Sequence, residues 1–162
     1  MKENDKKATA KRAGRALAAA VLLLYGFAAG GAPAGEQAFR VNVDTRALPA
    51  LGSALREENP YRGNATAVTV GAQVFEQACS RCHVLATSGG IGPDLRMLDV
   101  SCRKIADEAR RAACLRDQDH YFLKTVRDGK TIVGVTHMPG WRDFMSQEAI
   151  WAIRSYIESH NR

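Results

Sequence analysis

The chain has 162 residues, of which 23 are lysine or arginine and 17 are aspartate or glutamate, for a formal charge of +6. Residues 1–34 hold six of the bases and two of the acids, so residues 35–162 carry 17 bases, 15 acids and a net charge of only +2. The length fits one domain with a tail. The near balance of charge after residue 34 argues against nucleic-acid binding, and no nucleic-acid partner is expected.

Residues 1–34 have the layout of a secretory signal peptide. A basic start up to Arg15 is followed by an uncharged run, Ala16–Ala34, which ends in the small-residue pattern Ala32-Pro33-Ala34. The strongly apolar part, Leu17–Ala29, is shorter than the ~20 residues that a membrane-spanning helix needs. We therefore predict cleavage after Ala34 and export, with no stable membrane insertion of the mature chain. An uncleaved membrane anchor is the alternative.

After the leader we expect an irregular N-terminal arm over residues 35–66 and one folded domain over residues 67–162. The arm contains two prolines and has no sustained apolar period. From Val68 onward, apolar residues recur at three- and four-residue spacing, which predicts a helix that runs into Cys79. Glycines and a proline predict a loop over residues 88–93.

The C-terminal half is also predicted to be helical. We expect a short solvated helix over residues 103–116 and another helix over residues 117–128, which Gly129 ends. Residues 130–144 are predicted to form a loop, and no strand is predicted in the chain. Ser146 is the expected cap of a last helix. The apolar face of that helix consists of Ala149, Ile150, Ile153, Tyr156 and Ile157.

Cys79-Ser80-Arg81-Cys82-His83 is a C-x-x-C-H sequence, the signature of covalent haem attachment. Two thiols three positions apart can reach the two vinyl groups of one haem, and the adjacent histidine can supply an axial nitrogen to the iron. The alternatives are half of a zinc site and a redox-active dithiol. Cys102 and Cys114 do not form a second C-x-x-C, and a βαβ pattern is missing. The motif therefore predicts one covalently bound haem c.

The sixth ligand of the iron decides between an electron carrier and an enzyme. Met138 lies 55 residues after His83, which fits a chain that crosses to the opposite haem face, and a His/Met pair raises the haem potential. His137 is the rival ligand. The other candidates are Met97, His120, Met145 and His160. Iron with two protein ligands has no place for substrate, so we predict an electron-transfer protein. A peroxidase or gas sensor with an open sixth site is the alternative.

Three further features concern the surroundings of the haem. Trp141, three residues after Met138, is a candidate to close the haem crevice or to donate a hydrogen bond to a propionate. Other propionate candidates are Arg96, Tyr121 and Arg142. Cys102 and Cys114 are the thiols left after haem attachment in an exported chain, and we predict a disulfide between them.

Residues Val68–Ser159 resemble a class I cytochrome c. Besides the haem motif, the likeness is carried by Gly71, Phe75, Gly92-Pro93-Asp94-Leu95, Met138-Pro139, Ile153 and Tyr156. The resemblance implies an all-α fold around one haem, with first and last helices that cross at close range. It also implies that the carbonyl of Pro93 accepts a hydrogen bond from Nδ1 of His83. Relative to that family, this chain adds the N-terminal arm and an insertion from about Met97 to Asp117 that the cysteine pair brackets.

A closer resemblance covers about Val41–Ser159. Its stretches are Glu58–Asn64, SGGIGPDLRMLD, the extra cysteine pair, DHYFLKTVRDGK and SQEAIWAIRSYIE. They are similar to the cytochrome c that accepts electrons from quinoprotein (PQQ-dependent) ethanol dehydrogenase. The resemblance implies a periplasmic carrier with that alcohol dehydrogenase as donor and a downstream cytochrome or terminal oxidase as acceptor. A cytochrome subunit fixed in a larger oxidoreductase complex is another interpretation. Candidate docking charges are Arg103, Lys104, Arg110 and Arg111.

Overall fold

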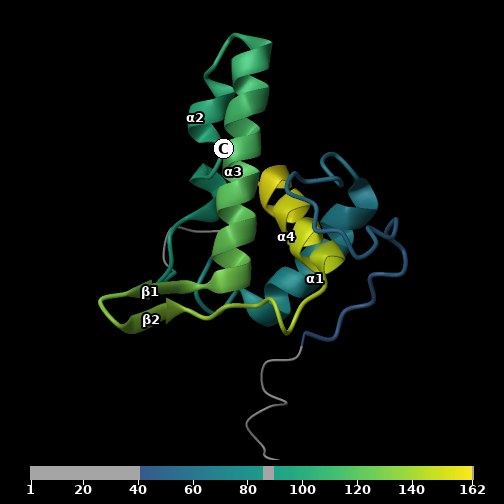
Figure 1. The fold of residues 1–162 in the computed structure, drawn as a ribbon, viewed down its shortest axis with the longest axis vertical. Coiled ribbons are helices and arrows are strands. Elements are labelled where there is room, and N and C mark those ends of the chain that lie inside the picture. The colour runs from purple at the N-terminus through teal and green to yellow at the C-terminus, as the bar shows by residue number, and fades with distance from the viewer. Residues whose placement is uncertain (1–40, 86–89, 162) are drawn as a thin grey trace, which may run out of the picture. The chain divides into compact units, whose positions relative to one another are not determined.

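The computed structural model describes residues 41–85 and 90–161, all of which belong to the unit Pro33–Arg162 of the two units into which the chain divides. The predicted leader and its cleavage site lie outside the described residues. The elements are α1 (Ala65–Ala78), η2 (Leu95–Met97), α2 (Val100–Arg103), α3 (Glu108–Asp128), β1 (Lys130–Ile132), β2 (Val135–Met138) and α4 (Gln147–Ser159) (Figure 1). The mostly helical fold expected for a class I cytochrome c is confirmed, with one small sheet added.

The helices α1 and α4 cross at close range and form the centre of the core. α1 begins at Ala65 because the side chain of Asn64 accepts a hydrogen bond from the N–H of Ala67 at 3.0 Å. A Cβ on Gly71 would lie 2.0 Å from the carbonyl oxygen of Ala152, so glycine is required where the two backbones meet. One turn further along α1, the ring of Phe75 packs against Tyr156 with centroids 5.4 Å apart. The crossing that the resemblance implied is therefore present.

The described part of the N-terminal arm is irregular, as predicted, but it is tied to α4. The N–H of Leu51 donates to the Glu148 carboxylate at 3.0 Å, and the Gln147 amide donates to the carbonyl of Gly52 at 2.7 Å. Leu51 and Tyr61 are buried in the same apolar cluster as α1 and α4. The arm thus completes the core on one side of α4. No helix among residues 41–85 and 90–161 is long and apolar enough to span a membrane.

One continuous helix, α3, replaces the two helices predicted over residues 103–116 and 117–128, so the predicted boundary at Asp117 is wrong. Asp107 caps α3 by accepting from the N–H of Arg110 at 2.8 Å, and Gly129 ends it with φ 74°. No glycine or proline interrupts residues 108–128. What changes along α3 is burial, because the first half is solvated while Phe122, Leu123 and Val126 are buried in the second half. A change in exposure therefore explains the change in sequence pattern.

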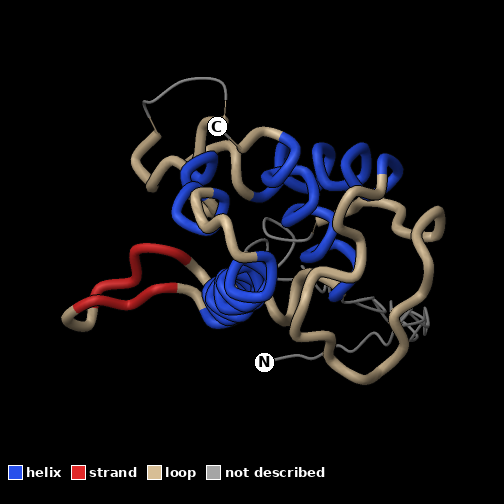
Figure 2. Tube along the Cα trace, turned by 90° about the horizontal axis from the view of Figure 1, so that it is seen from above, coloured by secondary structure: helices blue, strands red, loops and turns tan. Residues whose placement is uncertain are grey.

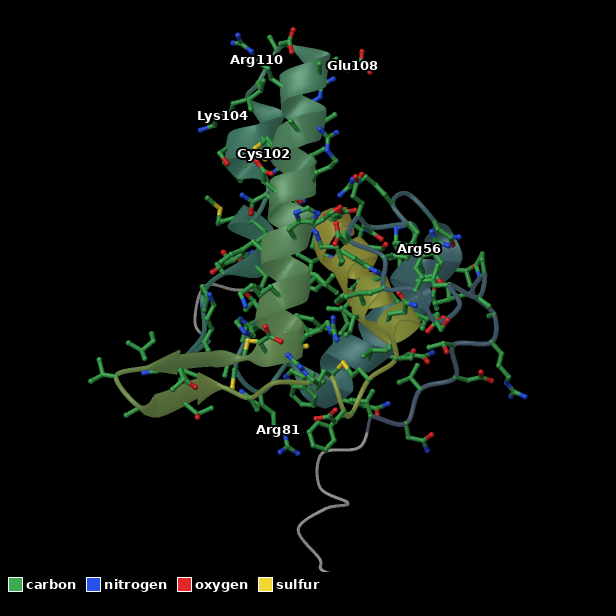
Figure 3. All side chains as sticks on the ribbon, viewed as in Figure 1. Arg56, Arg81, Cys102, Lys104, Glu108 and Arg110 are labelled. Carbon is green, nitrogen blue, oxygen red and sulfur yellow. A yellow bond between two sulfur atoms is a disulfide. The ribbon has the colours of Figure 1, made fainter. Side chains whose placement is uncertain are left out.

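The insertion is a helix pair closed by a disulfide. Cys102 on α2 is bonded to Cys114 on α3, with α-carbons 5.5 Å apart, which confirms the predicted pairing. Cys102 is fully buried between the two helices, and Lys104, Glu108 and Arg110 lie toward the same end of α3 (Figure 3). The disulfide therefore holds α2 against the solvated half of α3.

The loop predicted over residues 130–144 contains a β-hairpin, so the prediction of no strand is wrong. β1 and β2 pair antiparallel with Ile132 opposite Val135, which leaves Val133-Gly134 as a two-residue turn. The hairpin extends away from the helices (Figure 2). Most of its side chains are exposed, so its sequence lacks the alternation of buried and exposed residues that marks a strand on a core.

A buried ionic network joins the arm, the insertion and α4, and sequence analysis did not find it. The guanidinium of Arg154, which is fully buried on α4, donates to both carboxylate oxygens of Asp99 at 2.7 and 3.0 Å and to Asp119 at 2.9 Å. Asp119 also accepts from the N–H of Asn59 and from Arg62, both at 2.9 Å. Arg154 therefore pairs with two buried carboxylates, and it shares Asp119 with Arg62 of the arm.

Candidate haem site

The C-x-x-C-H motif forms a tight turn at the end of α1. The carbonyl of Cys79 accepts hydrogen bonds from the N–H groups of Cys82 and His83, at 3.0 and 2.8 Å. Both Cys79 and Cys82 are half-buried free thiols, whereas Arg81 is exposed and points outward (Figure 3). The helix thus delivers two thiols and an imidazole from one turn of backbone.

The segment Gly90–Pro93 packs directly against this turn. The N–H of Gly92 donates to the carbonyl of Cys82 at 2.9 Å. A Cβ on Gly90 would lie 2.3 Å from that same carbonyl, and a Cβ on Gly92 would lie 2.5 Å from the imidazole of His83. Both glycines are therefore needed for this approach, a role that sequence analysis did not assign. The GGIGP stretch offered only a turn signal, which does not say what the turn packs against.

His83 is oriented by a carbonyl. Its Nδ1 lies 3.0 Å from the carbonyl oxygen of Pro93, the contact that the resemblance implied. A hydrogen bond from Nδ1 selects the tautomer whose Nε2 carries a lone pair, and it raises the basicity of that nitrogen. The arrangement therefore prepares Nε2 to bind a metal ion.

The environment of the thiols does not suit the two alternatives to haem attachment. Burial raises the pKa of the Cys79 thiol to about 12, with a smaller contribution from Cys82, whereas reactive dithiols have a lowered pKa. Within residues 41–85 and 90–161, no group of three or more histidine, cysteine or acidic side chains is placed to hold a metal ion, as a zinc site would need. Two half-buried thiols beside an oriented imidazole, with a raised pKa at Cys79, fit covalent attachment of a haem.

Of the candidates for the sixth ligand, Met138 ends β2, and its side chain is half-buried against the apolar core. His137 precedes it on the strand and is exposed, as expected where successive side chains point to opposite faces. The backbone of Met138 lies close to the end of α3. A Cβ added to Gly129 would be only 2.4 Å from the carbonyl oxygen of Met138.

The remaining ligand candidates have other surroundings. Met97 is exposed on η2, and Met145 is buried in the core. His120 is exposed, with Nε2 3.6 Å from the Glu57 carboxylate, and the Nδ1 of His160 lies 3.0 Å from the carbonyl oxygen of Tyr156.

The four residues predicted as candidates for contacts with the haem propionates lie in different environments. Trp141 is buried. Its backbone N–H donates a hydrogen bond to the carbonyl of Val126 at 2.9 Å, so the chain after Met138 is fixed to α3. Arg142 pairs with Asp128 on the surface. Arg96 is buried and pairs with Asp94 at 2.7 Å, while Tyr121 is exposed beneath the ammonium of Lys130. Sequence spacing alone did not distinguish these environments.

Three buried side-chain polar atoms lack a hydrogen-bond partner in the part of the chain that the structure describes. They are Oγ1 of Thr125 on α3, Nε1 of Trp151 on α4 and Oδ1 of Asn161 after α4. Trp151 packs on Phe122, which precedes Thr125 by one turn of α3, with ring centroids 6.4 Å apart. Buried polar groups normally have hydrogen-bond partners, so these side chains are exceptions in this interior.

Comparison with known proteins agrees with this geometry. A family model described as cytochrome C oxidase, cbb3-type, subunit III, matches residues 66–157, a span that includes the C-x-x-C-H turn, Pro93 and Met138. Cytochrome c550 of Pseudomonas aeruginosa is 42% identical over 122 residues, which cover 72% of this chain and 74% of that protein. No solved structure matches. The chain therefore belongs to the cytochrome c family and is an electron carrier, rather than an enzyme, with covalently bound haem c.

Proposed function

We propose that this protein is a periplasmic monohaem cytochrome c that accepts single electrons from a PQQ-dependent alcohol dehydrogenase and passes them to the respiratory chain. The observation that carries the electron-transfer role is the C-x-x-C-H turn, with His83 oriented by the carbonyl of Pro93 at 3.0 Å. When bound, haem c supplies an iron that changes its oxidation state by one electron.

In this proposal each residue of the site has one task. Cys79 and Cys82 would hold the haem through thioether bonds, and His83 and Met138 would supply a nitrogen and a sulfur ligand to its iron. Soft sulfur favours the ferrous state and so raises the potential. Trp141 closes the crevice on the side of Met138. His83 is oriented by the carbonyl of Pro93 in the turn after α1, and Met138 ends β2, so both proposed ligands are carried by backbone that other segments hold in place.

The donor is proposed from the likeness of the stretches between Val41 and Ser159 to the acceptor of quinoprotein ethanol dehydrogenase. Residues 35–162 carry a net charge of only +2, and two propionates would bring it near zero. No large uniform field then steers the encounter, so we expect a small, weakly held interface with a short lifetime.

Stopped-flow reduction of the ferric protein by a purified quinoprotein ethanol dehydrogenase tests the donor. We expect fast reduction with a weak dependence on salt. A steep salt dependence would contradict the argument from neutral docking while leaving the donor in place. If the dehydrogenase of the same organism does not reduce the protein while another periplasmic donor does, the proposed donor is wrong.

The name of the matching family model, an oxidase subunit, favours a second candidate, a cytochrome fixed in a larger complex. The chemistry of the site is the same in both cases. Gel filtration of a native extract separates them, because a free carrier elutes near the mass of one chain and a fixed subunit elutes with its complex. N-terminal sequencing of the same material tests export, for which we expect a mature chain that starts at Gly35.

A further inference from the structure

The tip of the β1–β2 hairpin combines two features that folding does not explain. The first is exposure of aliphatic side chains: Ile132 is 57% exposed, Val133 is 97% exposed and Val135 is 59% exposed. These three residues are adjacent across the turn, because Ile132 pairs with Val135. They form an uncharged apolar tip on a hairpin that extends away from the helices (Figure 2).

The second feature is backbone strain at the same residue. Val133 has φ 48° and Gly134 has φ 76°, and Val133 is the only described non-glycine residue with positive φ. A two-residue hairpin turn with both φ values positive favours asparagine, aspartate or glycine, and a β-branched side chain is strongly disfavoured there. Val133 makes the conformation of the turn less favourable, and its side chain buries almost no surface that could compensate. Backbone strain retained without a gain in packing points to a function of the side chain.

The position of the hairpin suggests what kind of partner it binds. β2 begins at Val135 in the tip and ends at Met138, the proposed iron ligand. A protein bound to the tip is therefore separated from the proposed haem site by only a few residues of β2. Residues 124–143 hold four bases and two acids, a net charge of +2 that equals the entire net charge of residues 35–162. Both Lys124 and Arg142 pair with Asp128, and Lys130 lies 4.5 Å above the ring of Tyr121.

We infer that the hairpin tip, Ile132–Val135, is the recognition element for a redox partner protein whose docking surface has an apolar hollow bordered by carboxylates. The tip enters the hollow, and the two excess positive charges at the base of the hairpin face the carboxylates. This is a local contact of few charges, so the weak salt dependence expected above still applies. This inference rests on the proposed electron-transfer function but not on the identity of the donor.

The test replaces the tip residue without harming the turn. In Val133→Asn the new residue suits the left-handed conformation, so we expect an unchanged or higher melting temperature. We expect the second-order rate constant for electron exchange with the partner to fall about tenfold, the usual scale for loss of an aliphatic anchor at the centre of an interface. Reduction by ascorbate and the midpoint potential should not change. Met97→Asn, which removes a large exposed apolar side chain on η2, outside the hairpin and its charged base, is the matched control and should keep the wild-type rates.

Two reactions keep this test separate from the identity of the donor. One is reduction by purified quinoprotein ethanol dehydrogenase, and the other is oxidation of the ferrous protein by respiratory membranes of the same organism. If the dehydrogenase does not reduce the wild-type protein, the proposed donor is wrong. The role of the hairpin tip is then tested by the reaction with membranes alone. Equal rates for wild type and Val133→Asn in every reaction that proceeds would overturn the inference. So would a wild-type dimer that Val133→Asn converts to a monomer without any change in these rates, because the tip would then bind a second copy of the chain.

Discussion

At the scale of single residues, the C-x-x-C-H motif is the part of the predicted site that depends least on the fold, because its three side chains come from one helix end. Met138 as the second iron ligand stays a prediction, and the structure adds one observation that favours it over His137. The alternation of side chains along β2 exposes the histidine and turns the methionine toward the core.

We predict that Met138→Ala keeps its haem, because Cys79 and Cys82 are untouched, but loses the weak sulfur-to-iron absorption band of the ferric protein. The midpoint potential should fall, and the ferrous protein should now bind carbon monoxide, since the sixth position is open. Optical spectra and potentiometric titration measure these changes. His137→Ala is the matched control and should behave as wild type. A band that persists in Met138→Ala would mean that another residue binds the iron.

At the scale of elements, the crossing of α1 and α4 depends on one missing side chain. In Gly71→Ala the new Cβ would lie 2.0 Å from the carbonyl oxygen of Ala152 and 2.9 Å from Cβ of Tyr156. The helices must then move apart, and we expect a loss of unfolding free energy of about 1–3 kcal/mol or more. Urea denaturation measures it. Gln73→Ala, on the exposed face of the same helix, should change stability by less than about 0.5 kcal/mol. Equal stabilities of the two variants would contradict the close approach.

The disulfide-closed insertion is a second element whose contribution can be measured. Cys102 and Cys114 are 12 residues apart in sequence, and the chain-entropy model assigns roughly 3 kcal/mol to a loop of that size. We expect the double variant Cys102→Ser/Cys114→Ser to lose stability on this scale and to exchange amide hydrogens faster over α2 and the first half of α3. The visible spectrum should not change, because the haem motif is intact. If this variant lost its haem, the insertion would contribute to haem binding, contrary to this expectation.

At the scale of the whole molecule, Arg154 joins parts that are distant in sequence. Its guanidinium lies among Asp99, Asp119 and Glu158, and Asp119 in turn holds the arm through Asn59. In Arg154→Met the buried carboxylate of Asp99 loses its paired cation, whereas Asp119 keeps Arg62 at 2.9 Å. Removal of one partner from a buried pair costs about 3–5 kcal/mol. We expect a fall of that size in the free energy of unfolding.

Arg46→Met provides the control for this network, because Arg46 makes a similar two-oxygen pair with Asp44 on the surface. An exposed pair contributes little, so its loss should be close to neutral. A small effect of Arg154→Met would show that water reaches the network and that the arm is held by its other contacts, such as the hydrogen bonds of Leu51 and Gly52 to α4.

By itself, the sequence determined the haem attachment, the first and last helices and the disulfide, since each depends on residue types at short spacing or on the number of cysteines left over. Only the tertiary structure decided the rest. α3 is continuous because its backbone has no breaker, although its surroundings change from solvent to core at mid-length. The hairpin, the fit of Gly90 and Gly92 against the haem motif and the pairing of Arg154 with two aspartates are contacts between distant segments or exposed residues. Such contacts leave no periodic signal along the chain, because their partners are set by the fold rather than by spacing.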